Sequence, residues 1–254
     1  MHTLSDTWTM AKRSLRYIVR SPDTIITVVL MPIALLLLFV YVFGGALGKQ
    51  TGSAHYIDFL TPGIIIMTVV SGIAYAAYRL GADIQRGIIN RFRSMPVAPS
   101  SILGGQAASS TLSNLFSSLL VLLIAFVIGF RTHAGLSEWL LFVGLVALFT
   151  LATTWMAIFF GLLAKSAEGA GSFSYILMLL IFISPSFVPT GSMTSVLRGF
   201  ANNQPLTPII ETMRSLLTYG TPGDKVWTAL AWCVGILVVF YIGSLHLYRK
   251  KTTA

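Results

Sequence analysis

Charge is scarce in this 254-residue chain, and its scarcity argues against an ordinary soluble protein. Charged side chains make up 10% of the residues and hydrophobic ones 55%, whereas an average soluble domain has roughly 25% charged residues. The single cysteine, Cys233, excludes an intrachain disulfide and any C-x-x-C metal or redox motif. The four histidines are scattered, and neither H-E-x-x-H nor G-x-S-x-G occurs, so we expect no metal site and no enzyme active site.

Nucleotide-binding motifs are also missing. No G-x-x-x-x-G-K-[ST] phosphate loop occurs, and the glycines before Lys49 have the wrong spacing for one. The string Ile102-Leu-Gly-Gly-Gln106 is only superficially similar to the L-S-G-G-Q signature of ATP-binding cassettes. We therefore predict that this chain binds no ATP and holds no cofactor of its own.

Long apolar runs dominate what is present. A run of about 20 uncharged residues matches the roughly 30 Å hydrocarbon thickness of a bilayer. Such runs predict an all-α integral membrane protein, a single domain over residues 1–254, with six transmembrane helices at 24–43, 57–78, 107–130, 139–163, 170–188 and 226–246. The first run is too long for a cleaved signal peptide, and Pro32 within it is expected to kink the helix.

The formal net charge is +9, and the positive residues lie between the apolar runs. Twelve of the 17 Lys and Arg residues fall in the N-terminal segment, the second and fourth loops, and the C-terminal tail. Cytoplasmic loops carry an excess of these residues. Both termini are therefore predicted to be cytoplasmic, in a multi-pass protein of a bacterial cell (cytoplasmic) membrane.

Residues 1–22 are predicted to form an amphipathic helix on the membrane surface. Apolar side chains recur there at alternating steps of four and three: Leu4, Trp8, Ala11, Leu15 and Ile18. The basic residues occupy the opposite side. A plain lipid anchor is the alternative reading.

The second loop is predicted to contain a short cytoplasmic helix. Ile84, Ile88 and Phe92 are spaced four apart, Asp83 is a candidate N-cap, and Pro96 and Pro99 end the helix. A stiff helix held by two membrane spans could transmit force from a partner. A solvated basic loop is the alternative.

The outer loop over 189–225 is predicted to contain helices of its own. Thr207 and Pro208 have the pattern of an N-cap and a first helical position, and a helix from there ends near Gly220. A shorter apolar stripe, Val196, Leu197 and Phe200, precedes it. The two pieces fit either a shallow re-entrant hairpin or an ordinary interfacial loop.

The spans themselves are chemically quiet, since no Asp, Glu, Lys or Arg lies near the middle of any. Ion-coupled transporters usually need such groups. The third span has a polar face of small residues, which indicates either close helix packing or a substrate path; it consists of Ser110, Ser113, Asn114, Ser117 and Ser118.

Three stretches of the chain resemble the ABC-2 type permease family, in its short branch typified by the daunorubicin/doxorubicin-resistance membrane component. They are the N-terminal segment ending in Arg20-Ser-Pro22, the loop Asp83-Ile-Gln-Arg-Gly-Ile-Ile-Asn-Arg-Phe-Arg-Ser-Met-Pro96, and Phe187-Val-Pro189 with Asn203-Gln-Pro-Leu-Thr-Pro208 and Glu211-Thr-Met-Arg214. With six spans in matching order, the resemblance covers nearly the whole chain.

The resemblance implies that the segment 83–96 is a coupling helix that docks on a separate ATP-binding subunit, through Asp83, Arg86, Gly87, Arg91, Phe92, Arg93 and Pro96. It implies two permease subunits, identical or homologous, with two ATPase subunits that hold ATP and Mg. It also implies an outer gate on the export path, at Phe187, Pro189, Pro205, Glu211 and Arg214. Independently of the resemblance, the polar face of the third span makes Ser110, Asn114 and Ser117 the candidate substrate path, with helix packing as the alternative.

The function predicted is therefore the transmembrane half of an ATP-driven exporter of amphipathic small molecules or lipids, in contact with membrane lipids and not with nucleic acid. Two rival classes stay open on the sequence. One is an ion-coupled secondary transporter or channel, disfavoured by the uncharged spans. The other is a membrane scaffold without transport activity.

Overall fold

The computed structural model describes residues 26–51, 56–85 and 99–253. Within these ranges the chain is helical and contains no strand, which confirms the predicted all-α class. Five helices in this part of the chain are long and apolar enough to cross a membrane, by length and composition: Val28–Gly48, Tyr56–Asp83, Leu103–Ile128, Leu136–Leu163 and Val226–Tyr248. Four of them overlap the predicted spans closely, and the first extends five residues beyond its predicted end.

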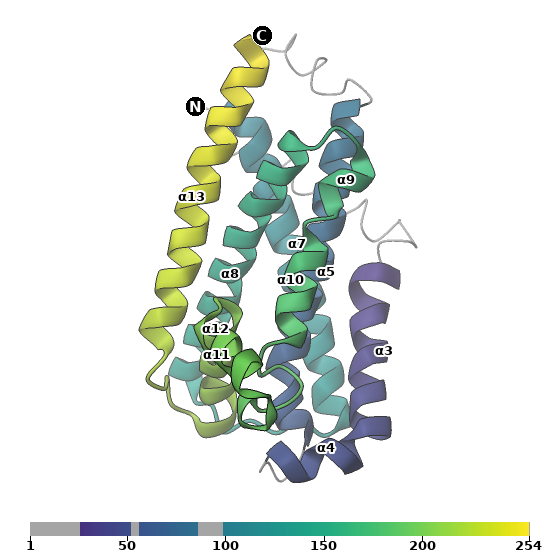
Figure 1. Cartoon of the computed structure of the whole chain (residues 1–254), viewed down its shortest axis with the longest axis vertical. Helices are drawn as coiled ribbons and strands as arrows, with labels where there is room; N and C mark the ends of the chain where they lie inside the picture. Colours follow the sequence, from purple (N-terminus) through teal and green to yellow (C-terminus); the bar gives the residue numbers. More distant parts are fainter. Residues whose placement is uncertain (1–25, 52–55, 86–98, 254) are drawn as a thin grey trace.

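The first span is assembled from four short pieces: η1 (Ile26–Leu30), α3 (Met31–Leu37), η2 (Leu38–Phe43) and α4 (Gly44–Thr51). Pro32 lies at the start of α3, directly after the π-helical η1. A proline cannot donate the usual backbone hydrogen bond, so the irregular turns occur where the sequence predicted a kink. α4 turns away from α3 at the end of the span (Figure 1).

The other long helices are α5 (Tyr56–Gln85), α7 (Pro99–Ile128), α8 (Leu136–Leu163) and α13 (Val226–Thr253). α5, α8 and α13 run in one direction and α7 in the other, so α5 and α8 end, and α7 begins, at the end of the bundle where α13 finishes (Figure 1). We refer to this end as the Gln85 end and to the opposite one as the Tyr56 end.

The helix α5 is the centre of the bundle. Its residues from Leu60 to Val70 are all buried, and an α-helix that is apolar on every side belongs inside a protein. The hydroxyls of Thr61 and Thr68 donate to the carbonyls of Ile57 and Ile64, so these polar atoms are satisfied within the helix. By contrast, α13 packs on α8 and leaves many apolar side chains exposed, as suits a lipid-facing helix.

The predicted fifth span, 170–188, contains two shorter helices, α9 (Ala167–Gly171) and α10 (Ser174–Phe182). Together they make an apolar segment over Ala167–Phe182 that lies along α5 (Figure 1). The contact is tight, because a Cβ built on Gly81 would lie 2.9 Å from the Cβ of Ala170 and 3.0 Å from the Cα of Ala167. Small residues permit this close approach of two helices.

The segment after α10 contains η3 (Thr190–Ser192), α11 (Ser195–Asn203), α12 (Leu206–Arg214) and η4 (Ser215–Tyr219), all at the Tyr56 end. The predicted N-cap was wrong by two residues: α12 starts at Leu206 with Pro205 at the cap. The Thr207 hydroxyl instead donates to the carbonyl of Ala201. Gly220 ends the helix in the left-handed conformation, with φ 63°, as predicted.

Two predictions concern the N-terminal segment and the loop that follows α5. The interfacial helix over 1–22 lies outside the described residues. Asp83 was predicted to be an N-cap, and this is wrong, because α5 continues through Asp83 to Gln85. The packing of α9 against Gly81 extends the helix past the membrane-spanning run and places Asp83 in its last turn.

Candidate functional site

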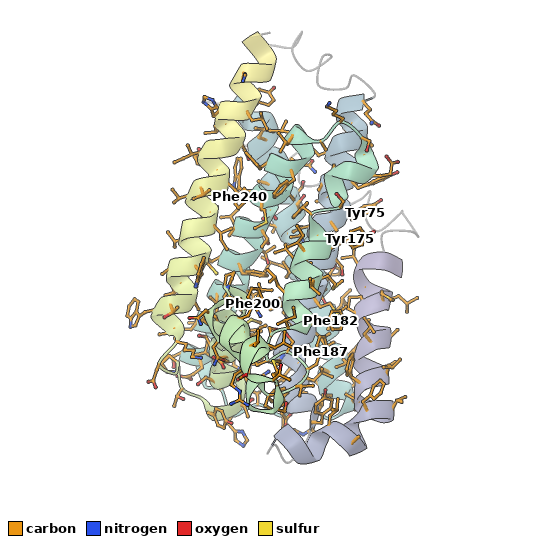
Figure 2. All side chains as sticks on the ribbon, in the orientation of Figure 1. Tyr75, Tyr175, Phe182, Phe187, Phe200 and Phe240 are labelled. Carbon is orange, nitrogen blue, oxygen red and sulfur yellow. The ribbon has the colours of Figure 1, made fainter. Side chains whose placement is uncertain are left out.

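A polar pocket lies between α5, α7 and the start of the first span. It is open to its surroundings and is lined by Val28, Gly72, Tyr75, Ala76, Arg79, Gln106, Ser109, Ser110, Ser113, Asn114 and Ser117. The structure therefore brings together three predicted substrate-path residues, Ser110, Asn114 and Ser117. Tyr75 marks its position on α5, nearer the Gln85 end than Phe182 and Phe187 (Figure 2).

The approach of α5 to α7 in this pocket depends on a glycine. A Cβ built on Gly72 would overlap the amide oxygen of Asn114 and lie 2.7 Å from its Cγ. Only glycine leaves room for the Asn114 side chain at this crossing. Asn114 is 2% exposed, yet no hydrogen bond joins its side chain to another described residue, so its amide is held in place by packing.

The serines of the pocket differ in how they are satisfied. The hydroxyls of Ser109 and Ser113 donate to the carbonyls of Gln106 and Ser109 on their own helix. Among the described residues, Ser110 and Ser117 have no such partner, although both are buried. Buried polar groups normally have a hydrogen-bond partner, so the hydroxyls of Ser110 and Ser117 are available to a ligand or water in the pocket.

A second site lies at the Tyr56 end and is centred on Arg214. Its guanidinium donates twice to the Phe59 carbonyl, at 3.1 and 2.9 Å, and once to the Pro185 carbonyl. Its Cζ also lies 3.6 Å from the centroid of the Phe59 ring, a cation–π arrangement. One side chain on α12 thus joins the start of α5 to the segment after α10.

Pro62 lies inside α5, three residues after the Phe59 carbonyl that Arg214 binds. A proline removes one helical hydrogen bond, here the one to the Asp58 carbonyl, and crowds the preceding turn. The guanidinium therefore binds α5 next to a local irregularity of the helix. Burial lowers the pKa of Arg214 to about 10, with Glu211 opposing the shift, so Arg214 is protonated at neutral pH.

Phe187, another predicted gate residue, belongs to the same cluster. The Tyr56 hydroxyl donates to the Phe187 carbonyl at 2.8 Å, and the Phe187 ring stacks on Phe39 and Phe182 with centroid distances of 4.6 and 5.1 Å. Figure 2 shows Phe182 and Phe187 close together below α10. We call Tyr56, Phe59, Phe187 and Arg214 the outer cluster.

A glycine again permits the close approach. A Cβ built on Gly63 would lie 2.7 to 2.9 Å from three atoms of Ser186, two of them backbone. The chain after α10 therefore lies directly on α5 at this position. Together with Arg214, this contact fixes the segment 184–187, which is buried throughout.

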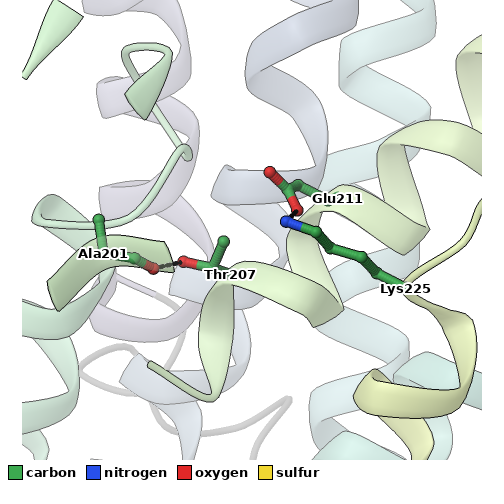
Figure 3. A network of polar contacts seen from close by, with 4 residues as sticks. All are labelled: Ala201, Thr207, Glu211 and Lys225. Carbon is green, nitrogen blue, oxygen red and sulfur yellow. Dashed lines mark hydrogen bonds and ion pairs between the residues drawn. The ribbon is translucent and has the colours of Figure 1, made fainter. Parts of the chain in front are cut away.

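The remaining predicted gate residues lie apart from the outer cluster. Glu211 forms an ion pair with Lys225 at the start of α13 (Figure 3). Pro189 and Pro205 precede η3 and α12 and contribute bends in the chain. Of the five predicted gate residues, the structure brings Phe187 and Arg214 together at the start of α5.

The predicted coupling segment is mostly outside the described residues. Arg86, Gly87, Arg91, Phe92, Arg93 and Pro96 lie there, and only Asp83 is described. Next to it, the Gln85 side chain donates to the Lys165 carbonyl at 3.3 Å, so the loop between α8 and α9 adjoins the end of α5. The described residues contain no group of three or more His, Cys, Asp or Glu side chains suited to a metal ion.

The sequence pointed to half of each site. For the pocket it identified the polar face of α7 but not the partners on α5, Gly72, Tyr75 and Arg79. For the outer cluster it missed Tyr56 and Phe59, which lie more than 120 residues from Phe187 and Arg214. A proline and several glycines inside an apolar run were the available signal, since such residues mark irregular or close backbone contacts.

A bundle of membrane-length helices, with its charged groups near the helix ends and a polar pocket within it, defines a multi-spanning membrane transport protein. Residues 5–218 match the ABC-2 type transporter family, and the chain belongs to this family. It is a membrane permease component, of a class that works with an ATP-binding subunit.

Similar proteins cover almost the whole chain. The daunorubicin resistance ABC transporter permease protein DrrB1 of Streptomyces coeruleorubidus is 29% identical over 259 residues, covering 98% of this chain and 86% of that protein. The probable doxorubicin resistance ABC transporter permease protein DrrC of Mycobacterium tuberculosis is 23% identical over 230 residues, covering 91% and 83%. The inner membrane transport permease YhhJ of Escherichia coli is 25% identical over 193 residues, covering 73% and 51%.

Proposed function

We propose that this permease exports amphipathic small molecules or lipids out of a bacterial cell, driven by an ATPase subunit that docks at the loop 83–96. ATP and Mg belong to that partner, and this chain holds no cofactor. Two permease subunits, identical or homologous, pair with two ATPase subunits in the membrane. The names of two relatives refer to drug resistance, which supports a small-molecule cargo.

The observation that carries this proposal is the contrast between the two halves of the bundle. The pocket, with its polar groups and Arg79, lies between the middle of the bundle and the Gln85 end. The Tyr56 end is held together by Arg214 and Phe187. With the Gln85 end facing the cytoplasm, the pocket is on the side from which an exporter takes up its cargo, and the opposite end is closed by packed side chains. This is the arrangement expected of an exporter before ATP drives the transport step.

We infer the orientation of the bundle from the positions of its basic residues. The described Lys165 and Lys250 lie toward the Gln85 end, where the predicted coupling loop also joins α5 to α7. The excess of basic residues in these loops supports a cytoplasmic Gln85 end, with both termini on that side. In this arrangement Ala167–Phe182 is the fifth of six spans, completed by the buried turn that follows it.

The role assigned to each set of residues then follows the path of the cargo. Ser110, Asn114 and Ser117 line its entry, and Phe187, Pro189, Pro205, Glu211 and Arg214 control its exit. The segment containing Asp83, Arg86, Gly87, Arg91, Phe92, Arg93 and Pro96 receives the stroke of the ATPase.

The test is to purify the permease from its native membrane and to ask which ATP-binding subunit accompanies it. Replacing Arg91 and Arg93 with Glu reverses two charges in the docking loop, so we expect at least a tenfold loss of co-purified ATPase, or of export per ATP hydrolysed, about 1.4 kcal/mol in coupling free energy. Lys250→Glu is the matched control, since it reverses a charge on α13 at the same end of the bundle. Equal recovery and activity in both variants would refute the docking assignment.

A further inference from the structure

The pocket between α5 and α7 contains a mixed set of hydrogen-bonding groups that points to one chemical class of ligand. Its lining residues on α7, Gln106 to Ser117, fall within Leu103–Ile128, the part of α7 that is long and apolar enough to cross a membrane. Asn114 is 98% buried, faces this cavity, and has no hydrogen-bond partner among the described residues. A polar group so placed calls for a ligand or water.

The pocket lining offers both hydrogen-bond donors and acceptors. The amides of Asn114 and Gln106 each offer two N–H donors and one carbonyl acceptor. The hydroxyl protons of Ser109 and Ser113 are already donated to carbonyls of α7, so these two oxygens are left as acceptors. The hydroxyls of Ser110 and Ser117 can donate and accept, and Arg79 adds a positive charge.

This set discriminates between three kinds of head group. A phosphate accepts hydrogen bonds but donates none at neutral pH, so the acceptor oxygens of Ser109 and Ser113 oppose it. A cationic amine needs acceptors and is stabilised by a carboxylate, but the lining contains no Asp or Glu and includes Arg79. A hydroxyl both donates and accepts, so a group with several hydroxyls can bond to the two amides and to the serine oxygens alike.

The surroundings of the pocket suit an apolar body attached to that head group. Leu112 and Phe116 lie on α7 beside the polar face and are 43% and 53% exposed. The Tyr75 ring is part of the lining, and an aromatic ring with a polar tip can pack on the apolar face of a sugar while bonding to its hydroxyls.

We infer that this pocket binds the neutral, polyhydroxylated head group of an amphipathic molecule, with the apolar part of that molecule along Leu112 and Phe116. The residues that carry the inference are Asn114, Gln106, Ser109, Ser113, Tyr75 and Arg79. The inference rests on the proposed export function, whose substrate class it narrows. It predicts that a sugar head group is preferred over a phosphate or an amine carried on the same alkyl chain.

The test uses the full chain in phosphatidylcholine nanodiscs, without ATP or a partner subunit. Cys233 is the single cysteine and is buried in α13, so Cys233→Ser provides a cysteine-free background. Ser113→Cys then places one thiol in the pocket, and its labelling rate with N-ethylmaleimide reports occupancy. Octyl glucoside, octyl phosphate and octylamine, each below its micellar concentration, are the probes.

We expect octyl glucoside to slow labelling of Ser113→Cys by about fivefold at concentrations where the phosphate and the amine change it by less than twofold, a preference of about 1 kcal/mol or less. Ser137→Cys, at the exposed start of α8, is the control thiol and should be unaffected by all three. Equal or greater protection by the phosphate or the amine overturns the inference, and so does equal protection at Ser137→Cys.

Two further variants separate a ligand site from a structural contact. Asn114→Ala should remove the preference for the glucoside without preventing labelling, whereas Ser118→Ala, on α7 outside the lining, should retain it. Ser110→Cys replaces Ser113→Cys if that variant does not fold, and failure of both thiols to react would show the pocket to be closed and overturn the inference. Failure of ATPase co-purification would refute the proposed function and leave this binding result unchanged.

Discussion

The outer cluster and the polar pocket both bury polar groups in an apolar bundle, but they use them in opposite ways. In the outer cluster, Arg214 and Tyr56 bind carbonyls of segments far away in the sequence. In the pocket, the hydroxyls of Ser109 and Ser113 bond to their own helix, and Asn114 bonds to no described residue. Polar groups thus join distant segments at the Tyr56 end, whereas those of the pocket do not connect one helix to another.

The largest expected effect comes from removing the cation of the outer cluster. Arg214→Ala leaves two buried carbonyls without their donors and removes the contact with the Phe59 ring. We expect a loss of roughly 3 kcal/mol in the free energy of unfolding, seen as a lower Tm in detergent, together with loss of export.

Arg198→Ala is the matched control for this prediction. Arg198 also donates to three backbone carbonyls, but they belong to residues five to eight positions away, and the side chain is exposed. Its loss should cost under about 1 kcal/mol. Similar Tm shifts for the two arginines would mean that the outer cluster is no more than a local helix cap.

The glycines of the two sites provide the next test. Gly63→Ala and Gly72→Ala should each lower the Tm, since each added methyl group overlaps an atom of a facing segment, at a cost of about 1–3 kcal/mol. Gly144→Ala, with open space around its Cβ, is the control and should be neutral or slightly stabilising.

The rescue of these two variants should differ. At Gly72 the obstacle is the Asn114 side chain, so Asn114→Ala should restore the stability of Gly72→Ala. At Gly63 the obstacle includes the Ser186 backbone, so Ser186→Ala should restore little. Equal rescue at both positions would contradict this distinction, in which a side chain opposes Gly72 and the backbone opposes Gly63.

The smallest effect is expected for the ion pair between Glu211 and Lys225. Both side chains are partly exposed, at 29% and 48%, and such pairs contribute about 0.5 kcal/mol. Lys225→Met should therefore shift the Tm by about a degree and lose even this effect in 1 M salt. A Tm shift as large as that of Arg214→Ala would mean that the ion pair between α12 and the start of α13 stabilises this end of the bundle as much as the outer cluster does.

Much of the fold could be predicted from the sequence because the bilayer imposes a simple rule on length and polarity. Each long apolar run became a helix close to its predicted bounds. The exceptions have local causes. The segment around 170–188 breaks at residues 172 and 173 between two short helices, and α5 extends past the apolar run because Gly81 lets α9 pack against its last turns.

The sites were only half predictable, since periodicity places a residue on one face of its own helix and gives no information about the helix opposite. The polar stripe of Ser110, Asn114 and Ser117 was visible in the sequence. Its pairing with Gly72 and Tyr75 depends on a tertiary contact. In the same way, nothing near Arg214 in the sequence indicates that its acceptor is the carbonyl of Phe59.

The double attachment of the segment 164–188 to α5 has a mechanical consequence. One end is attached at Gly81 and Gln85, where α9 and the Lys165 carbonyl meet the helix, and the other at Gly63, beneath Ser186. Between Gly63 and Gln85, α5 is a rod about 33 Å long at 1.5 Å per residue. A force on the Gln85 end of α5 would tilt the helix and the attached segment as one rigid unit. Arg214 binds α5 near the opposite end, so its contacts are the ones that such a motion would break or form again.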